Sequence, residues 1–376
     1  MVAPLVPPRV RLPLAPGASR RALREEPPPM PADHEPPSEL RDAEGRAIRY
    51  LRLSITDRCD MACTYCMPPE GEREHGLRDE LLSFEEIVRL VRLLASHGLR
   101  RVRLTGGEPL VRRDVVSLVA RLAETGIEDL WLTTNGSRLA ALAEPLRAAG
   151  LVGVNVSVDS LDPARFARIT RGGDLFGVRR GLEAALAAGL SLRTNTVVLR
   201  SENLGELAAI ARFAWSIGAT PRFIELMPIG EGARLPPSER VGAVEMRAAL
   251  GELGLGDEAL GDPGRGPARY LSTRGEGTGG APARRVGLIT AVSDEFCASC
   301  NRMRVTSHGE VRPCLASRRA VSLRELLRGG ASDREVLHAL GWALGGKGPG
   351  HRFDHDAQSG TLDVDHHQVG MSLVGG

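Results

Sequence analysis

From Tyr50 onward, the hydrophobic pattern of the chain switches repeatedly between two periods. Short apolar runs typical of strands are separated by longer segments in which apolar residues recur every three or four positions, as on one face of a helix. The first clear helix is predicted to begin at Ser83. There Ser83 and Glu86 have the spacing of a capping box, and an apolar stripe runs from Ile87 to Leu94.

Six strands and the helices between them are predicted in this way. The strands are expected at Leu51–Thr56, Val102–Thr105, Asp129–Thr134, Val152–Val158, Ser191–Leu199 and Thr220–Leu226. Further helices are expected at about 112–124, 138–148, 176–188 and 203–217. Strand–helix units repeated in this order predict an α/β fold whose parallel sheet curves into a partial or full barrel. Right-handed crossovers would then place the carboxyl ends of all the strands on one face.

The same pattern divides the chain into four parts. Residues 1–47 hold eleven of the 25 prolines within the first 37 positions, and such a segment cannot bury enough apolar surface to offset its ordering entropy. We therefore expect a disordered extension at 1–47 and a barrel at 48–228. Gly- and Pro-rich stretches predict a connector or small subdomain at 229–287, followed by a C-terminal region at 288–376.

Composition excludes several classes of protein. A chain of 376 residues with 42% hydrophobic residues can form a large α/β domain with a smaller appendage. A net charge of +2 and only 3% aromatic residues argue against nucleic-acid binding. No apolar run approaches the length of a membrane span, and no secretory signal is recognisable, so we expect a cytoplasmic protein that does not bind membranes. Lys347 is the only lysine.

The six cysteines form two triplets, Cys59, Cys63, Cys66 and Cys297, Cys300, Cys314. Close triplets in a long chain without an export signal favour metal ligands over disulfides. Three thiolates can hold three irons of a [4Fe–4S] cluster, which leaves the fourth iron free to bind a small molecule. A zinc ion is the alternative at each triplet, with His75 and His308 as the nearest fourth ligands.

The surroundings of the first triplet resemble the radical S-adenosylmethionine (SAM) superfamily. The loop Cys59-x-x-x-Cys63-x-x-Cys66 has Tyr65 before its last cysteine, and a Gly-Gly-Glu motif at Thr105–Pro109 follows the second predicted strand. The resemblance implies a partial (βα)6 TIM-like barrel in which the open iron binds SAM, and one-electron reduction then cleaves SAM to a 5'-deoxyadenosyl radical. It also implies SAM contacts at Tyr65, Gly107, Glu108, Ser157 and Met227.

Further motifs are similar to a narrower family, the GTP 3',8-cyclases of molybdenum cofactor biosynthesis. These motifs are Tyr50–Cys59, Thr133–Gly136, Asn155–Ser160, Phe223–Pro228, Phe296–Arg304 and the terminal Gly375-Gly376. The resemblance implies two [4Fe–4S] clusters, with GTP bound at the open iron of the second one. It implies GTP contacts at Arg52, Arg103, Thr133, Arg193, Arg302, Met303 and Arg304, and catalytic roles for Arg193, Gly375 and Gly376.

In that family the adenosyl radical takes the 3' hydrogen of GTP, and the resulting C3' radical attacks C8 of guanine. The resemblance implies that the product, (8S)-3',8-cyclo-7,8-dihydroguanosine 5'-triphosphate, passes to a cyclic pyranopterin monophosphate synthase. It also implies an external one-electron donor, and a homodimer is one option for the assembly.

Two positions depart from the family pattern. Arg193 stands where a lysine is expected, and Asp60 stands where an asparagine usually follows the first cysteine. The alternative function is that of another radical SAM enzyme, whose auxiliary cluster serves to modify a peptide or small molecule. A zinc-binding module that contacts nucleic acid is a more distant alternative. The Arg302–Arg304 span and the terminal glycines favour the cyclase.

Overall fold

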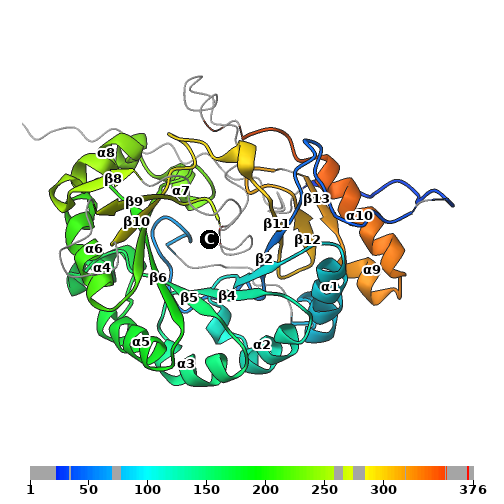
Figure 1. The fold of residues 1–376 in the computed structure, drawn as a ribbon, viewed down its shortest axis with the longest axis horizontal. Coiled ribbons are helices and arrows are strands. Elements are labelled where there is room, and N and C mark those ends of the chain that lie inside the picture. The colour runs from blue at the N-terminus through cyan, green and yellow to red at the C-terminus, as the bar shows by residue number, and fades with distance from the viewer. Residues whose placement is uncertain are drawn as a thin grey trace, which may run out of the picture.

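The computed structural model describes residues 23–33, 35–69, 78–257, 266–273, 284–317 and 319–351, together with Phe353 and Met371. The described strands form one curved sheet, in the order β1-β13-β12-β11-β2-β3-β4-β5-β6-β7-β10-β9-β8. Six neighbouring strands in its centre are parallel and form the predicted partial barrel: β2 (Tyr50–Ser54), β3 (Arg101–Thr105), β4 (Asp129–Thr134), β5 (Gly153–Ser157), β6 (Ser191–Val198) and β7 (Thr220–Glu225). Figure 1 shows these strands curving around an open centre, with helices on the outside.

The predicted helices are present, with shifts of a few residues at their ends. They are α1 (Phe84–Ser96), α2 (Val115–Ala123), α3 (Leu139–Ala148), α5 (Leu175–Ala187) and α6 (Leu207–Ser216). Both hydrogen bonds of the capping box between Ser83 and Glu86 are formed. One barrel helix, α4 (Pro163–Thr170), was not predicted, although Asp162 as its N-cap and Pro163 in its first turn are ordinary start signals.

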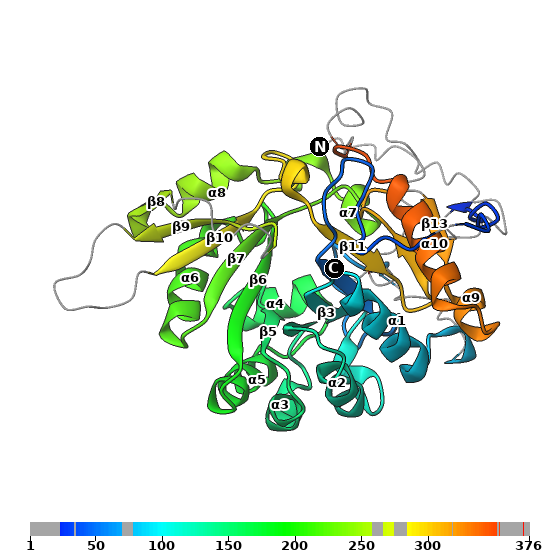
Figure 2. The ribbon, with the colours of Figure 1, turned by 45° about the vertical axis from the view of Figure 1, so that its right-hand side comes forward.

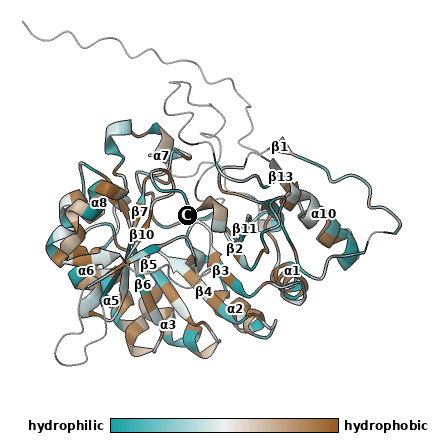
Figure 3. Ribbon diagram, turned by 45° about the horizontal axis from the view of Figure 1, so that its top comes forward, coloured by the Kyte–Doolittle hydropathy of each residue, from teal (hydrophilic) through white to brown (hydrophobic). Residues whose placement is uncertain are grey.

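The barrel is stable as an α/β layer structure because each helix buries one face against the sheet. In α1 the side chains of Ile87, Leu90, Val91 and Leu94 are fully buried, as the predicted stripe requires. Figure 3 shows hydrophilic and hydrophobic residues on the same outer helices, as expected for elements with one face in solvent. Within the described ranges, no helix has both the length and the apolar character needed to cross a bilayer.

After β7 the chain extends the sheet at both of its edges. It first forms α7 (Glu231–Arg234), α8 (Ala243–Ala249), β8 (Leu255–Asp257), β9 (Arg269–Thr273) and β10 (Arg285–Ile289), and then β11 (Arg302–Val305), β12 (Glu310–Arg312), β13 (Arg319–Ser322), α9 (Arg324–Arg328) and α10 (Asp333–Gly345). Strand β10 pairs in parallel with β7, whereas β11 pairs in parallel with β2 at the opposite end of the barrel. The segment 290–301 therefore crosses the opening of the barrel, between β10 and β11 in Figure 2.

Two expectations about the ends of the barrel need revision. The boundary expected between residues 287 and 288 falls inside β10. The expected disorder of residues 1–47 is wrong for its described C-terminal part, because Leu40 and Asp42 are buried and β1 (Leu23–Arg24) pairs with β13. The pattern missed this part because a few isolated residues anchor it through tertiary contacts rather than through a periodic face.

Candidate active site

A cavity of about 250 Å³ lies at the carboxyl ends of the barrel strands. All six cysteines line it, although the two triplets lie at opposite ends of the chain. Cys59, Cys63 and Cys66 follow β2, and Cys297 and Cys300 lie on the segment that crosses the barrel opening. The crossing brings the two triplets to one cavity, which sequence spacing alone could not establish.

Most of the predicted site residues also line this cavity. They are Tyr65, Gly107, Glu108, Ser157 and Met227 of the SAM set and Arg52, Arg103, Thr133, Arg302 and Arg304 of the GTP set. Met303 is an exception, because alternation along β11 turns its side chain into the hydrophobic core, where it is 1% exposed. Arg193 does not line the cavity either; its guanidinium lies 4.0 Å from the centre of the Trp131 ring. Gly375 and Gly376 lie outside the described residues.

The first triplet has the properties of a metal site. Its three thiols are free and partly buried. Burial raises the pKa of Cys59 to about 12 and raises that of Cys63 well above its usual value. Thiolates in such a cavity need a positive partner, and a bound iron–sulfur cluster supplies that charge. The Met61 amide, 3.5 Å from the Cys59 sulfur, already donates toward it.

The Gly-Gly-Glu motif packs directly against the first cysteine loop. A Cβ at Gly107 would lie 2.3 Å from the Arg58 carbonyl oxygen, so only glycine allows this approach. The next side chain, Glu108, is fully buried and accepts hydrogen bonds from the Thr134 hydroxyl (2.7 Å) and from two backbone amides, those of Leu110 (3.0 Å) and Asn135 (2.6 Å). Burial raises the pKa of Glu108 to about 7, and these donors fix its orientation.

Replacing Gly107 with alanine should displace the cysteine loop, because the new Cβ would clash with the Arg58 backbone. We expect SAM cleavage to fall about 100-fold, the loss typical of a misplacement of about 1 Å in an active site. The measurement is 5'-deoxyadenosine formation under reducing, anaerobic conditions. Gly341→Ala is the control, because that position in α10 has no atom within 4 Å of an added Cβ. Equal rates in the two variants would contradict the close approach at Gly107.

The structure accounts for Asp60, the unusual residue after the first cysteine. Its carboxylate accepts hydrogen bonds from the side-chain amide Nδ2 of Asn135 and from the Ser137 hydroxyl, both at 2.7 Å. Arg138 Nε lies 3.6 Å from the same carboxylate. All three partners follow β4. Asp60 therefore ties the cysteine loop to the loop after β4.

A second buried carboxylate orients Tyr65. The Tyr65 hydroxyl donates to Asp159 Oδ2 at 2.6 Å, and the Val197 amide donates to Asp159 Oδ1 at 2.9 Å. Burial raises the pKa of Asp159 to about 6. Asp159 lies within the Asn155–Ser160 motif but was not predicted as a site residue.

The arginines form a cationic wall on the barrel side of the cavity. Arg222 on β7, which the sequence analysis missed, lines the cavity and is 2% exposed. It donates to the side-chain carbonyls of Asn195 (2.7 Å) and Asn155, which are neutral partners. Arg103 Nε has no hydrogen-bond partner among the described residues. Burial and Arg103 lower the pKa of Arg222 to about 9, as expected for a buried cation next to another cation.

The second triplet lines the same cavity and lies close to Arg302 and Arg304 of β11. Burial opposes ionisation of Cys300, but Arg302 and Lys347 outweigh it and lower the pKa of this thiol to about 7. His308, the expected fourth ligand of a zinc ion, does not line the cavity and lies 3.9 Å from Asp57. His75 lies outside the described residues.

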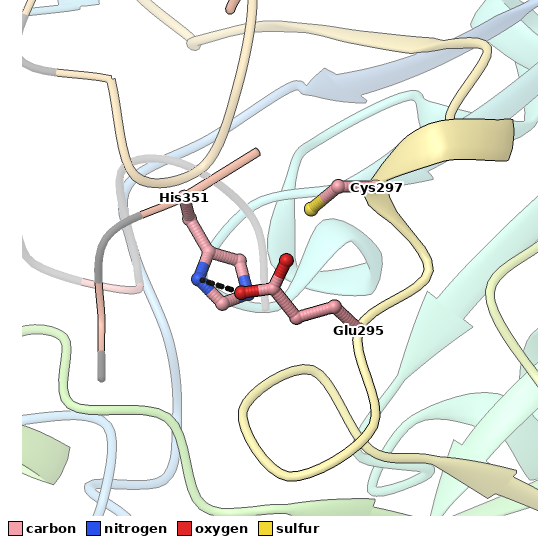
Figure 4. A group of neighbouring side chains, drawn as sticks. All are labelled: Glu295, Cys297 and His351. Carbon is pink, nitrogen blue, oxygen red and sulfur yellow. Dashed lines mark ion pairs between the residues drawn. The ribbon is translucent and has the colours of Figure 1, made fainter. Parts of the chain in front are cut away.

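Two further metal-ligating side chains lie beside Cys297. His351 Nδ1 is 3.3 Å from Glu295 Oε1, and the ligand atoms of Glu295, Cys297 and His351 all lie within 4.8 Å of one another (Figure 4). Cys297 is part of the triplet that lines the cavity. Glu295 and His351 thus lie together next to one cysteine of the triplet.

Comparison with known proteins identifies the family. The Radical SAM superfamily model matches residues 53–214, and the Molybdenum Cofactor Synthesis C model matches residues 219–353. A GTP 3',8-cyclase of Heliobacterium modesticaldum is 49% identical over 297 residues, covering 78% of this chain and 88% of the relative. A GTP 3',8-cyclase of Rhodopseudomonas palustris (strain TIE-1) is 44% identical over 342 residues, covering 90% of this chain and 96% of the relative. The chain belongs to the GTP 3',8-cyclase family.

Solved structures confirm the radical SAM fold. Streptococcus suis SuiB bound to S-adenosylmethionine has a TM-score of 0.55 with 15% sequence identity, covering 77% of this chain and 67% of that protein. Membership of the GTP 3',8-cyclase family means that SAM and [4Fe–4S] clusters are the cofactors, and the free thiols that line the cavity fit them.

Proposed function

We propose that this chain catalyses the radical SAM cyclisation of GTP to (8S)-3',8-cyclo-7,8-dihydroguanosine 5'-triphosphate, the first step of molybdenum cofactor biosynthesis. The observation that carries the proposal is that one cavity is lined by two cysteine triplets with a wall of arginines. A cluster able to bind SAM and a site able to bind a triphosphate are thereby held within one enclosure.

The first triplet and its surroundings are proposed to bind SAM. Cys59, Cys63 and Cys66 would hold the first cluster, which with SAM supplies a 5'-deoxyadenosyl radical. Glu108 is fixed by its three donors and can receive the methionine ammonium through a charge-assisted hydrogen bond. Gly107 allows the backbone to approach the ligand. Tyr65, Ser157 and Met227 line the same cavity and complete the proposed set.

The second triplet and the arginines are proposed to bind GTP. Cys297, Cys300 and Cys314 would hold the second cluster, whose open iron can take the guanine. Triphosphate oxygens are good partners for the forked guanidinium groups of Arg52, Arg103, Arg302 and Arg304. We add Arg222 to this set, because it lines the cavity and its hydrogen-bond partners Asn155 and Asn195 are uncharged.

Other assignments rest on the family resemblance. They include GTP contacts at Thr133 and Met303 and roles for Arg193, Gly375 and Gly376 in the radical chemistry. A division into a barrel at 48–228, a connector and a second-cluster region remains our working proposal, with the boundary between the last two moved from 287/288 to beyond β10 (Arg285–Ile289). So do transfer of the product to a cyclic pyranopterin monophosphate synthase, an external electron donor, a homodimer and a cytoplasmic location.

Anaerobic incubation with SAM, GTP and a one-electron reductant tests the proposed function. The expected result is 5'-deoxyadenosine together with a cyclised nucleotide of the same mass as GTP, because the one hydrogen atom taken from C3' is replaced by one electron from the reductant and one proton. Mass analysis after chromatography distinguishes it from unreacted GTP by retention and by loss of the 3' deuterium from labelled GTP. Abundant 5'-deoxyadenosine without any change in GTP would favour the alternative, a radical SAM enzyme acting on another substrate.

Arg222 should contribute directly to binding of the triphosphate. Replacing Arg222 with methionine removes the charge but keeps much of the volume, and we expect the Kd for GTP to rise about 10- to 100-fold, as for a lost charge-assisted hydrogen bond. Guanosine, which lacks the phosphates, should bind both forms alike. Isothermal titration under anaerobic conditions gives both values. An equal loss for guanosine would mean that Arg222 supports the cavity rather than the phosphates.

A further inference from the structure

The single lysine of the chain lies in an unusual place. Of the 49 Lys and Arg residues, every one except Lys347 is an arginine. Lys347 lies just after α10 and is 3% exposed. Its ammonium donates to the carbonyl oxygens of Cys300 and Arg302, both at 2.9 Å, and lies 3.2 Å from Asp42 Oδ2. Three acceptors for three N–H donors is the full capacity of an ammonium group.

The acid in this group belongs to the N-terminal segment that the sequence analysis expected to be disordered. The Asp42 side chain is fully buried, and its oxygens accept from the backbone amides of Glu44 (3.1 Å) and Arg46 (3.0 Å) and from Arg46 Nε (2.8 Å). Asp42 therefore holds both Lys347 and Arg46 in place.

Arg46 contacts the same cysteine loop. Its guanidinium donates to the Cys297 carbonyl at 2.7 Å and to the Gly348 carbonyl at 2.8 Å. The carbonyls of Cys297, Cys300 and Arg302 are thus all bound by the side chains of two cations that share one carboxylate. We call Asp42, Arg46 and Lys347 the second-cluster clamp.

We propose that the second-cluster clamp positions Cys297 and Cys300 for the second cluster, and that Lys347 also provides a fixed positive charge beside it. This inference rests on the proposed function, in which these cysteines hold that cluster. None of the three residues lines the cavity, so they act through the loop and are positioning residues.

Physical reasons favour a positioning role over simple stabilisation. Replacing a buried ion pair by well-packed apolar residues is often neutral for stability, because the desolvation cost offsets the attraction, and in some proteins such pairs specify geometry instead. The bound groups are carbonyls of a short loop, and hydrogen bonds around the ligands of a metal site set ligand orientation. Lysine suits this place because its compact ammonium reaches three converging acceptors, whereas a planar guanidinium spreads its donors in a fork.

The test uses the full chain with Cys59, Cys63 and Cys66 replaced by alanine, so that the second cluster is the only one. This parent protein should carry about 4 irons per chain. Two quantities are measured: the rate of iron release to a chelator, and the midpoint potential of the cluster by a redox titration followed by electron paramagnetic resonance. Circular dichroism checks the fold of each variant.

Lys347→Met should release iron about 10-fold faster or more, the scale typical of losing a supporting residue around a metal site. Its midpoint potential should become more negative, because a nearby cation favours the reduced cluster. Lys347→Arg should keep a potential near that of the parent and still release iron faster, since it keeps the charge but not the geometry. Asp42→Asn should release iron faster as well. If Lys347→Met does not fold, the arginine and asparagine variants decide by the same two readouts.

Arg89→Met is the matched control. Like Lys347, Arg89 is a cation that donates to a backbone carbonyl and to a carboxylate, here those of Ala331 and Asp333. It contacts neither triplet. It should leave iron release and potential unchanged. The clamp is refuted if the Lys347 and Asp42 variants release iron at the rate of the parent, or if Arg89→Met releases it equally fast. A parent protein that binds no iron would refute the second-cluster assignment and the clamp together, an outcome distinct from failure of the clamp alone.

Discussion

Replacing Cys59, Cys63 and Cys66 with alanine should abolish SAM cleavage and halve the iron content. Two cubane clusters correspond to about 8 irons per chain, so about 4 should remain, all at the second triplet. Cleavage should disappear because the first cluster, which is proposed to bind SAM, loses all three of its thiolate ligands. Iron analysis and 5'-deoxyadenosine formation are the two measurements.

The control for this first prediction is a single replacement outside the site. Trp342→Ala is suitable, because Trp342 is 45% exposed on α10 and does not line the cavity. It should keep full iron and normal cleavage. Production of 5'-deoxyadenosine by the triple cysteine variant would show that the first triplet does not hold the SAM-cleaving cluster.

Replacing Cys297, Cys300 and Cys314 with alanine should have the opposite selectivity. SAM binding should be largely kept, because the proposed SAM contacts belong to the barrel and not to the crossing segment. GTP binding and cyclisation should be lost, because guanine loses its iron and Arg302 and Arg304 lose the anchored loop before them. The measurements are SAM and GTP affinities by anaerobic titration, together with assay of the cyclised product.

The division of labour between the triplets can fail in a recognisable way. Equal loss of SAM and GTP binding in this second variant would mean that the two triplets form one cooperative unit. Binding of GTP at normal affinity would mean that the arginines alone hold the nucleotide. The Arg222→Met variant, which keeps both triplets, separates these cases, since it should weaken GTP binding while leaving SAM cleavage intact.

Sequence pattern determined the barrel because the features of parallel strands and capped helices are local. The six strands fall where short apolar runs predict them, and α1 begins at its capping box. The two cysteine triplets could also be predicted from the sequence, because the spacing of ligands along the chain is a local property. The missed helix α4 had its start signals in sequence and could have been found.

Alternation within one strand accounts for the position of the arginines on β11. It places Arg302 and Arg304 on one face, and both line the cavity. The same rule places Met303 on the opposite face, in the core, although the family resemblance had grouped it with its neighbours. Inner-face position on β7 could likewise have identified Arg222.

Tertiary structure alone decided what lies next to the second triplet. The segment around Asp42 is anchored by contacts such as Arg46 to the Cys297 carbonyl, which join residues 251 positions apart. Strand β11 pairs with β2 rather than with β10, so the chain crosses the barrel opening between them. No periodicity records such pairings, because they are fixed by the packing of the whole sheet and not by neighbours in sequence. The sequence by itself therefore determined the barrel and the ligands, and only the folded chain determined how the second set of ligands is held against the first.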